Sequence, residues 1–159
     1  MSQTRLATSA DAHDIARLLR AFNAEYDDIV PEQRELAERM SQLLAAGDTA
    51  VLLGYDPDDA HDPGAPHGLV VLRFRPAIWV AAPECYLAEL YVAPGNRGRG
   101  LGRALLNAAI EYARGRGAAW MDLGTSEDDV AARALYESVG FVNREGEGGP
   151  IQYVYELDL

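Results

Sequence analysis

The sequence predicts a mixed α/β fold with the element order β-α-α-β-β-β-α-β-α-β-β. Four segments repeat apolar residues at helical spacing, and short β-rich runs bounded by proline and glycine separate them. The strands before residue 92 follow one another closely, which favours antiparallel pairing, whereas the later strand-helix-strand units require a parallel pair. A chain of 159 residues that is 48% hydrophobic suits one domain over residues 1–159.

The first third of the chain predicts a short strand and two helices. The strand covers residues 4–8, and Ser9 is the expected cap of the first helix. The second helix starts near Pro31 and ends at Gly47. The apolar faces of these helices consist of Ile15, Leu18, Leu19 and Phe22 in the first, and Leu36, Met40, Leu43 and Leu44 in the second.

Three strands are expected in the middle of the chain. Residues 49–55 form a buried strand, and residues 56–67, rich in Pro, Gly and Asp, form an exposed turn. The next two strands cover residues 68–75 and residues 84–92, with a loop that begins at Pro76 between them.

The last third predicts two helices and three strands. A helix opened by Gly100 stops near Gly115 and Gly117, and Ser126 caps another that runs through Val139 and ends at Gly140. The strands are expected at residues 118–124, 142–144 and 151–157, with a turn at residues 145–150.

The stretch from Val92 to Leu106 carries most of the functional information, because a glycine and arginine turn links a strand to an amphipathic helix. Its glycines let several N–H groups point inward, the helix N-terminus adds partial positive charge, and the arginines add full charges. The glycines at 95, 98, 100 and 102 match neither the dinucleotide pattern nor Walker A. The turn therefore predicts a site for another anionic cofactor, unless it is only a solvated connection.

Two motifs in order resemble the GNAT acetyltransferases. The first is Arg97-x-x-Gly100-x-Gly102 directly after the strand of residues 87–92, and the second is Leu135-Tyr136-Glu137 followed by Gly140-Phe141. The resemblance covers most of the chain, weakly before Val51. It implies the GNAT fold, with a mixed central sheet splayed where the cofactor enters, and acetyl-CoA as co-substrate. The implied cofactor-binding residues are Leu90, Tyr91, Val92, Arg97, Gly98, Arg99, Gly100, Leu101, Gly102, Arg103 and Asp129.

The resemblance also implies catalytic roles. A primary amine is free of its proton in only about one molecule in a thousand at pH 7, so a base is needed. Glu89, an acid in an apolar strand, is the first candidate for this base, but a substrate-binding or solvent-facing role stays open, and Asp122 is its rival. Tyr136 aligns with the tyrosine that protonates the departing CoA thiolate, or else packs on its helix.

Two further assignments depend on the family pattern. Where the family frequently has asparagine, Asp129 either contacts the pantetheine arm as an acceptor only or favours the first turn of its helix. In the family, backbone N–H groups exposed by a bulge in the strand before the glycine turn bind the thioester oxygen. The link between the first two helices usually lines the acceptor pocket, which assigns substrate binding to Tyr26, Asp27 and Asp28, with Tyr153 opposite.

Composition excludes several classes. The formal net charge of −11 argues against nucleic-acid binding, and no apolar run is long enough for a membrane helix. The N-terminus lacks a signal-peptide layout, so a cytoplasmic location is expected. The single cysteine, Cys85, is expected to be buried packing, and three scattered histidines predict no metal site.

The predicted function is N-acetyl transfer from acetyl-CoA to a primary amine by direct attack, without an acetyl-enzyme. The acceptor is a small-molecule or protein amine, and the acidic chain mildly favours a cationic one. Two alternatives stay open: a non-catalytic acyl-CoA-binding sensor or assembly module, and a nucleotide-phosphate binder. Family members often dimerise, so a homodimer is one option for the assembly.

Overall fold

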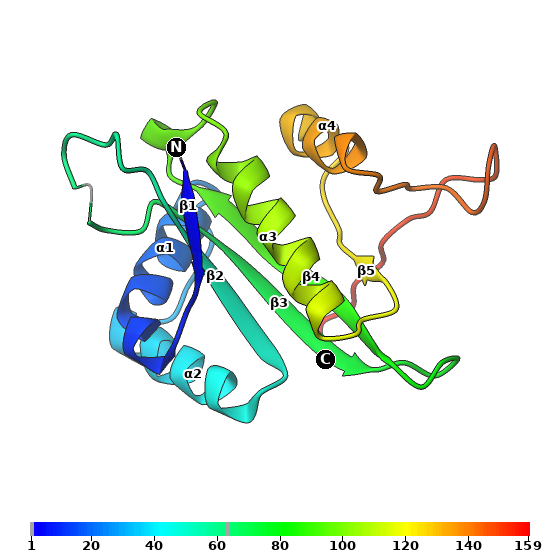
Figure 1. The fold of residues 1–159 in the computed structure, drawn as a ribbon, viewed down its shortest axis with the longest axis horizontal. Helices are drawn as coiled ribbons and strands as arrows, with labels where there is room; N and C mark the ends of the chain where they lie inside the picture. The colour runs from blue at the N-terminus through cyan, green and yellow to red at the C-terminus, as the bar shows by residue number, and fades with distance from the viewer. Residues whose placement is uncertain (1, 63) are drawn as a thin grey trace. The chain divides into compact units, whose positions relative to one another are not determined.

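A computed structural model describes residues 2–62 and 64–159 (Figure 1). The chain divides into two compact units, residues 1–122 and residues 123–159. The elements of the first unit are β1 (Gln3–Leu6), η1 (Ser9–Asp11), α1 (Ala12–Ala24), α2 (Gln33–Ala46), β2 (Thr49–Tyr55), β3 (Gly68–Pro76), β4 (Pro83–Val92), η2 (Pro94–Asn96), α3 (Leu101–Gly115) and β5 (Met121–Asp122). The second unit contains α4 (Val130–Ser138).

The sheet of the first unit has five strands in the order β1-β2-β3-β4-β5. The pairs from β1 to β4 are antiparallel, and β4 pairs with β5 in parallel. This confirms the predicted mixed sheet, in which closely spaced strands pair antiparallel and the connection through α3 returns a parallel strand.

Helices cover both faces of the sheet (Figure 1). On one face, α1 and α2 bury a core that includes Ile15, Leu18, Val51, Leu53 and Leu69. On the other face lies α3, whose buried Leu101 and Leu105 approach Gly54 and Gly68. A Cβ atom at Gly54 would meet the Leu101 side chain at 2.9 Å, so these glycines let α3 pack closely on the strands.

Cys85 is buried in β4, as the sequence predicts. Its side chain is fully buried, and burial raises the pKa of its thiol to about 11. A thiol with so high a pKa stays protonated near neutral pH and is a poor nucleophile.

Several element boundaries differ from the sequence prediction. Residues 9–11 form a short 3-10 helix, and Thr8 rather than Ser9 caps it. The strand predicted at residues 118–124 shortens to β5, Met121–Asp122. The last helix starts at Val130 instead of following Ser126, because the Asp129 carboxylate accepts a hydrogen bond from the Ala132 amide at 3.1 Å and caps it.

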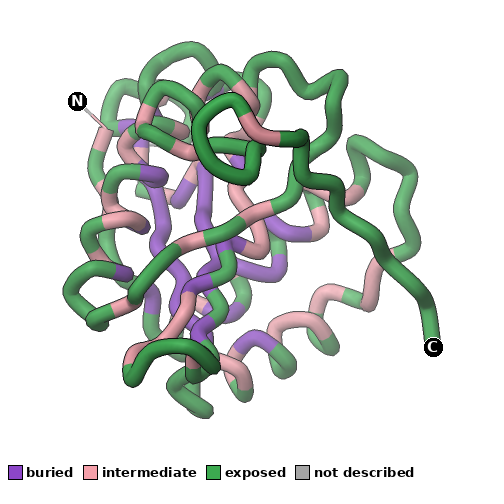
Figure 2. Tube along the Cα trace, turned by 90° about the vertical axis from the view of Figure 1, so that its right-hand side faces the viewer, coloured by how far each residue is buried: buried purple, intermediate pink, exposed green. Residues whose placement is uncertain are grey.

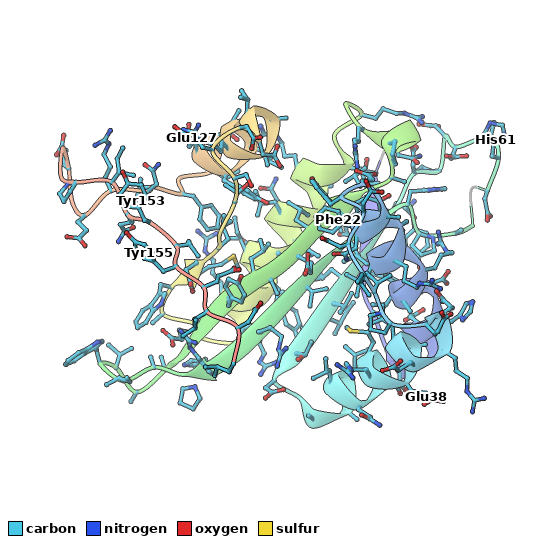
Figure 3. All side chains as sticks on the ribbon, turned by 180° about the vertical axis from the view of Figure 1, so that it is seen from behind. Phe22, Glu38, His61, Glu127, Tyr153 and Tyr155 are labelled. Carbon is cyan, nitrogen blue, oxygen red and sulfur yellow. The ribbon has the colours of Figure 1, made fainter. Side chains whose placement is uncertain are left out.

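The two closing strands predicted at residues 142–144 and 151–157 are not present as strands in the described chain. A single antiparallel bridge joins Arg144 to Ile151, and the Gln152 amide donates to the Asn143 carbonyl at 2.8 Å. The residues that follow are exposed, as Figure 2 shows, and the side chains of Tyr153 and Tyr155 extend from this segment in Figure 3. Apolar alternation alone does not form a strand without a partner ladder and a buried face.

The unit of residues 123–159 explains the second sequence motif. The ring of Tyr136 packs edge-to-face on Phe141, with centroids 5.9 Å apart, and the Phe141 amide donates to the Tyr136 carbonyl at 3.1 Å. Gly140 between them has a φ of +104°, which a side chain would oppose. The single-domain organisation of residues 1–159 stays a prediction. No helix in the described part of the chain has the length and apolar character to cross a membrane.

Candidate active site

Strand β4 contains a bulge four residues before its end, Val92. Val71 faces Glu89 in the ladder, but the next residue of β3, Leu72, faces Leu87, so Ala88 is an extra residue on β4. An extra residue bends the strand and changes the direction of the residues beside it. The sequence-based expectation of a bulge before the glycine turn therefore has a structural counterpart at Ala88.

The ladder also defines where the amides beyond the bulge point. The Ala93 amide donates to the His67 carbonyl of the β3 side at 2.8 Å. Hydrogen-bonded and non-hydrogen-bonded pairs alternate in an antiparallel ladder, so the Tyr91 amide also points toward β3. The amides of Leu90 and Val92 point to the opposite edge of β4. On that edge β5 pairs only with Cys85 and Tyr86, which leaves the end of β4 without a strand partner among the described residues.

The glycine turn supplies further amides next to this edge. Gly98 and Gly100 have φ values of +74° and +87°, and Gly100 is the N-cap of α3. Within the described chain, no backbone carbonyl accepts a hydrogen bond from the amides of residues 98–103, and the first bond of α3 runs from Ala104 to Gly100. These N–H groups, together with the dipole of α3, are able to bind an anion.

The three arginines of the turn have different roles. The Arg97 guanidinium contacts the Glu25 carboxylate at 2.8 Å, and the Arg99 guanidinium contacts the Asp56 carboxylate at 2.8 Å. Arg103 is exposed on the first turn of α3, and no ion pair to it is present within the part of the chain that the structure describes. Arg103 is therefore the arginine of the turn whose charge an anionic ligand can use without breaking a protein contact.

A buried polar cluster of Asn96, Asp56 and Asp59 attaches the glycine turn to the loop after β2. The Asn96 amide donates to the carboxylates of Asp56 at 3.2 Å and Asp59 at 2.9 Å. The Asn96 side chain and the backbone amides of His61 and Asp62 together lower the pKa of Asp59 to about 2. Burial alone would raise the pKa of Asp56, but Asn96, the Asp58 amide and Arg99 outweigh it and lower that pKa. Both acids are thus held ionised beneath the turn.

Glu89 lies next to the bulge on the sheet face that α1 covers. It shares this face with Val71, its ladder partner, and with the buried Tyr91. The carboxyl group is partly buried, and burial raises its pKa above the ordinary glutamate value. A raised pKa makes a carboxylate a stronger proton acceptor, so the geometry suits Glu89 to the predicted base.

Asp122 occupies a different part of the sheet. It pairs with Tyr86, roughly 20 Å along β4 from Val92 at about 3.3 Å per residue. Burial also raises the pKa of Asp122, while the nearby Arg75 lowers it. Its place near the start of β4 favours Glu89 as the base beside the glycine turn.

The predicted acceptor residues follow the C-terminal end of α1. Tyr26 is exposed and packs edge-to-face on Phe22, with ring centroids 5.7 Å apart. Phe22, labelled in Figure 3, stacks in turn on Tyr91 at 5.1 Å. Asp27 has a φ of +55°, and Asp28 is exposed beside it. An aromatic row therefore connects the acceptor segment to β4, next to Glu89.

Two predicted residues, Asp129 and Tyr136, belong to the unit of residues 123–159. The Asp129 carboxylate is used as the cap of α4, which agrees with the structural alternative considered from the sequence. Tyr136 is partly buried and packs on Phe141. Their roles toward a cofactor stay predictions.

The sequence did not indicate two residues that organise the site, Asn96 and Asp56, nor the partner of Glu25. Asn96 and Asp56 belong to the polar cluster under the turn, and Glu25 pairs with Arg97. One signal for the polar cluster was present in the sequence: Asp56 is a charged residue that directly follows the buried strand of residues 49–55. No local pattern could indicate the pairing of Glu25 with Arg97, because it joins residues far apart in the sequence.

Comparison with known proteins decides the family. The sequence profile of the Acetyltransferase (GNAT) family matches residues 15–141. The chain belongs to the GNAT family. A crystal structure from Arthrobacter sp. FB24, of a protein assigned as an acetyltransferase, superposes on this GNAT chain with a TM-score of 0.86 at 42% identity, covering 99% of this chain and 96% of that one.

Curated relatives of this GNAT chain are named for different acceptors. The mycothiol acetyltransferase of Gordonia bronchialis is 33% identical over 86% of this chain and 43% of its own length. The aminoglycoside N(6')-acetyltransferase type 1 of Stenotrophomonas maltophilia is 31% identical, over 89% of this chain and 86% of its own length. The thialysine N-epsilon-acetyltransferase of Bos taurus is 27% identical, over 86% of this chain and 81% of its own length. The chain spans less than half the length of the first relatives that it matches.

Proposed function

We propose that this chain is an acetyl-CoA-dependent N-acetyltransferase that acetylates a primary amine of a cationic small molecule by direct attack. The observation that carries the proposal is the run of amides at residues 98–103, which have no backbone acceptor in the described chain and lie at the positive end of α3. The GNAT family and the relatives named for aminoglycosides and thialysine support it.

The residues present fit a diphosphate-bearing cofactor. A Cβ atom at Gly98 or Gly100 would meet no atom within 4 Å, so the turn borders open space rather than packed side chains. The amides of residues 98–103 and the Arg103 side chain would hold the phosphates, while Leu90 and Val92 would offer amides from the free edge of β4. Acetyl-CoA, when bound, supplies an acetyl group on a thioester.

Glu89 would remove the proton that keeps the amine unreactive. Its partly buried carboxylate accepts that proton directly or through a water, which raises the fraction of neutral amine at the site. The amides of Leu90 and Val92 would stabilise negative charge that develops on the carbonyl oxygen. Tyr136 would donate a proton to the leaving thiolate, a modest contribution because thiols with a pKa of about 8.5 leave readily.

The acceptor segment supports a cationic amine. Glu25, Asp27 and Asp28 follow one another at the end of α1, and Tyr26 presents an exposed ring among them. Carboxylates attract an ammonium group, and an aromatic face adds cation–π attraction. Tyr26, Asp27 and Asp28 are therefore the proposed substrate-binding residues.

Turnover of a panel of amines tests the proposal. Free CoA is measured as thiol release from acetyl-CoA, with an aminoglycoside, thialysine, a polyamine and a lysine peptide as acceptors. The proposal expects turnover that is fastest with a cationic small molecule. Binding of acetyl-CoA without turnover of any acceptor would favour a sensor, and preference for ATP or NAD over CoA would favour a nucleotide binder.

A further inference from the structure

The Arg97 side chain contacts Glu25 at the end of α1 and the end of β4. Its Nη2 atom donates to both carboxylate oxygens of Glu25 at 2.8 Å, and its Nε atom donates to the Val92 carbonyl at 2.8 Å. The guanidinium also lies 5.7 Å from the ring centroid of Tyr91. The side chain is thereby held on the α1 side by three contacts, two of which are charge-assisted.

Glu25 occupies an electrostatically unfavourable place that needs such a partner. It is the C-cap of α1, where the helix dipole places partial negative charge, and Asp27 and Asp28 follow it. The Tyr91 hydroxyl donates to the same carboxylate at 3.4 Å. Burial is the main cause of the raised pKa of Tyr91, and the negative charge of Glu25 is the second. Among the contacts of the described residues, Arg97 is the cation that compensates this acidic end of the helix.

We propose that Arg97 is a positioning residue for the amine acceptor, which acts through Glu25 to fix the segment of residues 25–28 against the end of β4. The inference deepens the proposed function, on which it rests. The cofactor loop and the acceptor segment are thus joined by one ion pair, and the side chain of Arg97 serves the acceptor while the amides of its loop serve the cofactor.

The physical consequence is a split between the two substrates. Without Arg97, the like charges of Glu25, Asp27 and Asp28 repel one another at the negative end of α1, and the segment loses its attachment to Val92. The amine then meets a less ordered site, whereas the amides of residues 98–103 and Arg103 are unchanged. Amine recognition falls, and binding of acetyl-CoA is retained.

Kinetics of Arg97→Gln, Glu25→Gln and the double variant test this. Each single substitution should raise the KM of the amine about fivefold with acetyl-CoA affinity within about twofold, and the double variant should be no worse than either single one. Arg97→Lys, which keeps the charge but cannot reach Glu25 and Val92 together, should recover part of the loss. Glu38→Gln on α2, labelled in Figure 3, removes another ion pair and serves as the matched control, with no change expected.

A measurement of acetyl-CoA binding distinguishes the proposed role of Arg97 from a role as a phosphate ligand. If Arg97→Gln weakens acetyl-CoA binding as strongly as Arg103→Gln while Glu25→Gln leaves it unchanged, Arg97 is a phosphate ligand and the proposal is wrong. Thermal unfolding of the wild type, Arg97→Gln, Glu25→Gln and the double variant needs no acceptor. The loss in Tm of the double variant should be smaller than the sum of the single losses. Additive losses would show that the residues are not coupled, whether or not the chain acetylates any amine.

Discussion

Glu89 lies opposite Val71 in the β3–β4 ladder, immediately after the extra residue Ala88 that forms the bulge. This relationship places a partly buried carboxylate on the α1 face and, at the next residue, the Leu90 amide on the free edge of β4. One irregularity in one strand therefore brings a proton acceptor and a hydrogen-bond donor to the same place. The proposed chemistry needs both groups within reach of one reacting centre.

Replacement of Glu89 by Gln should lower kcat/KM by about 100-fold or more, because general base catalysis is typically worth about 10² to 10⁴. Burial raises the pKa of Glu89, so the wild-type rate should fall on the acid side at a pH above the ordinary glutamate pKa, as the carboxylate gains a proton. This acid limb should disappear in the variant. Asp122→Asn, on β5 beside the start of β4, is the control. An unchanged pH–rate profile in Glu89→Gln would remove Glu89 from the role.

Alanine at Gly100 should weaken CoA binding and destabilise the protein by about 1 kcal/mol, because a Cβ atom disfavours its left-handed backbone. The φ of +87° at the N-cap of α3 is the cause, since no atom would clash with the added methyl group. Gly95→Ala is a matched control in the same turn, also with open space around it but without a positive φ. Equal effects at the two positions in calorimetry and urea unfolding would contradict the account.

Arg103→Gln should reduce CoA affinity about tenfold, the effect of losing one charge-assisted contact to phosphate. The dependence of binding on salt concentration should weaken as well, because a screened ionic contact has been removed. Arg114→Gln, at the other end of α3 and paired with Glu111, is the control and should bind CoA normally. A wild-type salt dependence in Arg103→Gln would show that this side chain does not contact the phosphates.

Much of the fold follows from local patterns. The helices α1, α2 and α3 and the strands β2, β3 and β4 lie close to their predicted ranges, because each has a regular apolar period and clear breakers. The glycine turn was recognisable because it needs particular residue types. The bulge at Ala88 was not placed, since it depends on the register between two strands rather than on either sequence alone.

The two closing strands were predicted from the sequence but are not formed in the described structure. Residues 151–157 alternate in the way a half-buried strand does, yet in the described structure they have no ladder beyond the bridge of Ile151 to Arg144. The pairing of Glu25 with Arg97 was equally hidden, because it requires α1 and the glycine turn to meet in space. Long-range partners decide both features, and a single sequence does not contain them.

Asn96→Ala should lower the free energy of unfolding at pH 7 by about 1 to 3 kcal/mol, because Asp56 and Asp59 would lose a buried donor. Asn96 is the largest of the causes that lower the pKa of Asp59 to about 2 in the folded state, so its stabilisation is present above the ordinary aspartate pKa and is lost as the pH falls toward 2. Urea unfolding at pH 7 and pH 3 should show a smaller difference between variant and wild type at pH 3. Asn107→Ala, exposed on α3, is the control.

Tyr136→Phe should slow turnover by about tenfold or less without abolishing it, because a thiolate leaves readily even without a general acid. The ring contact with Phe141 is kept in phenylalanine. Steady-state kinetics measure the loss, and circular dichroism shows that the variant is folded. A complete loss of activity with normal folding would indicate that the hydroxyl does more than protonate the leaving group.

Isothermal titration calorimetry of the wild-type chain with CoA measures directly whether the glycine turn binds the cofactor. We expect saturable binding of one CoA per chain, weakened in Gly100→Ala and Arg103→Gln but unchanged in Gly95→Ala and Arg114→Gln. No binding by the folded wild-type protein, or equal binding by all four variants, would show that the turn is not the CoA site.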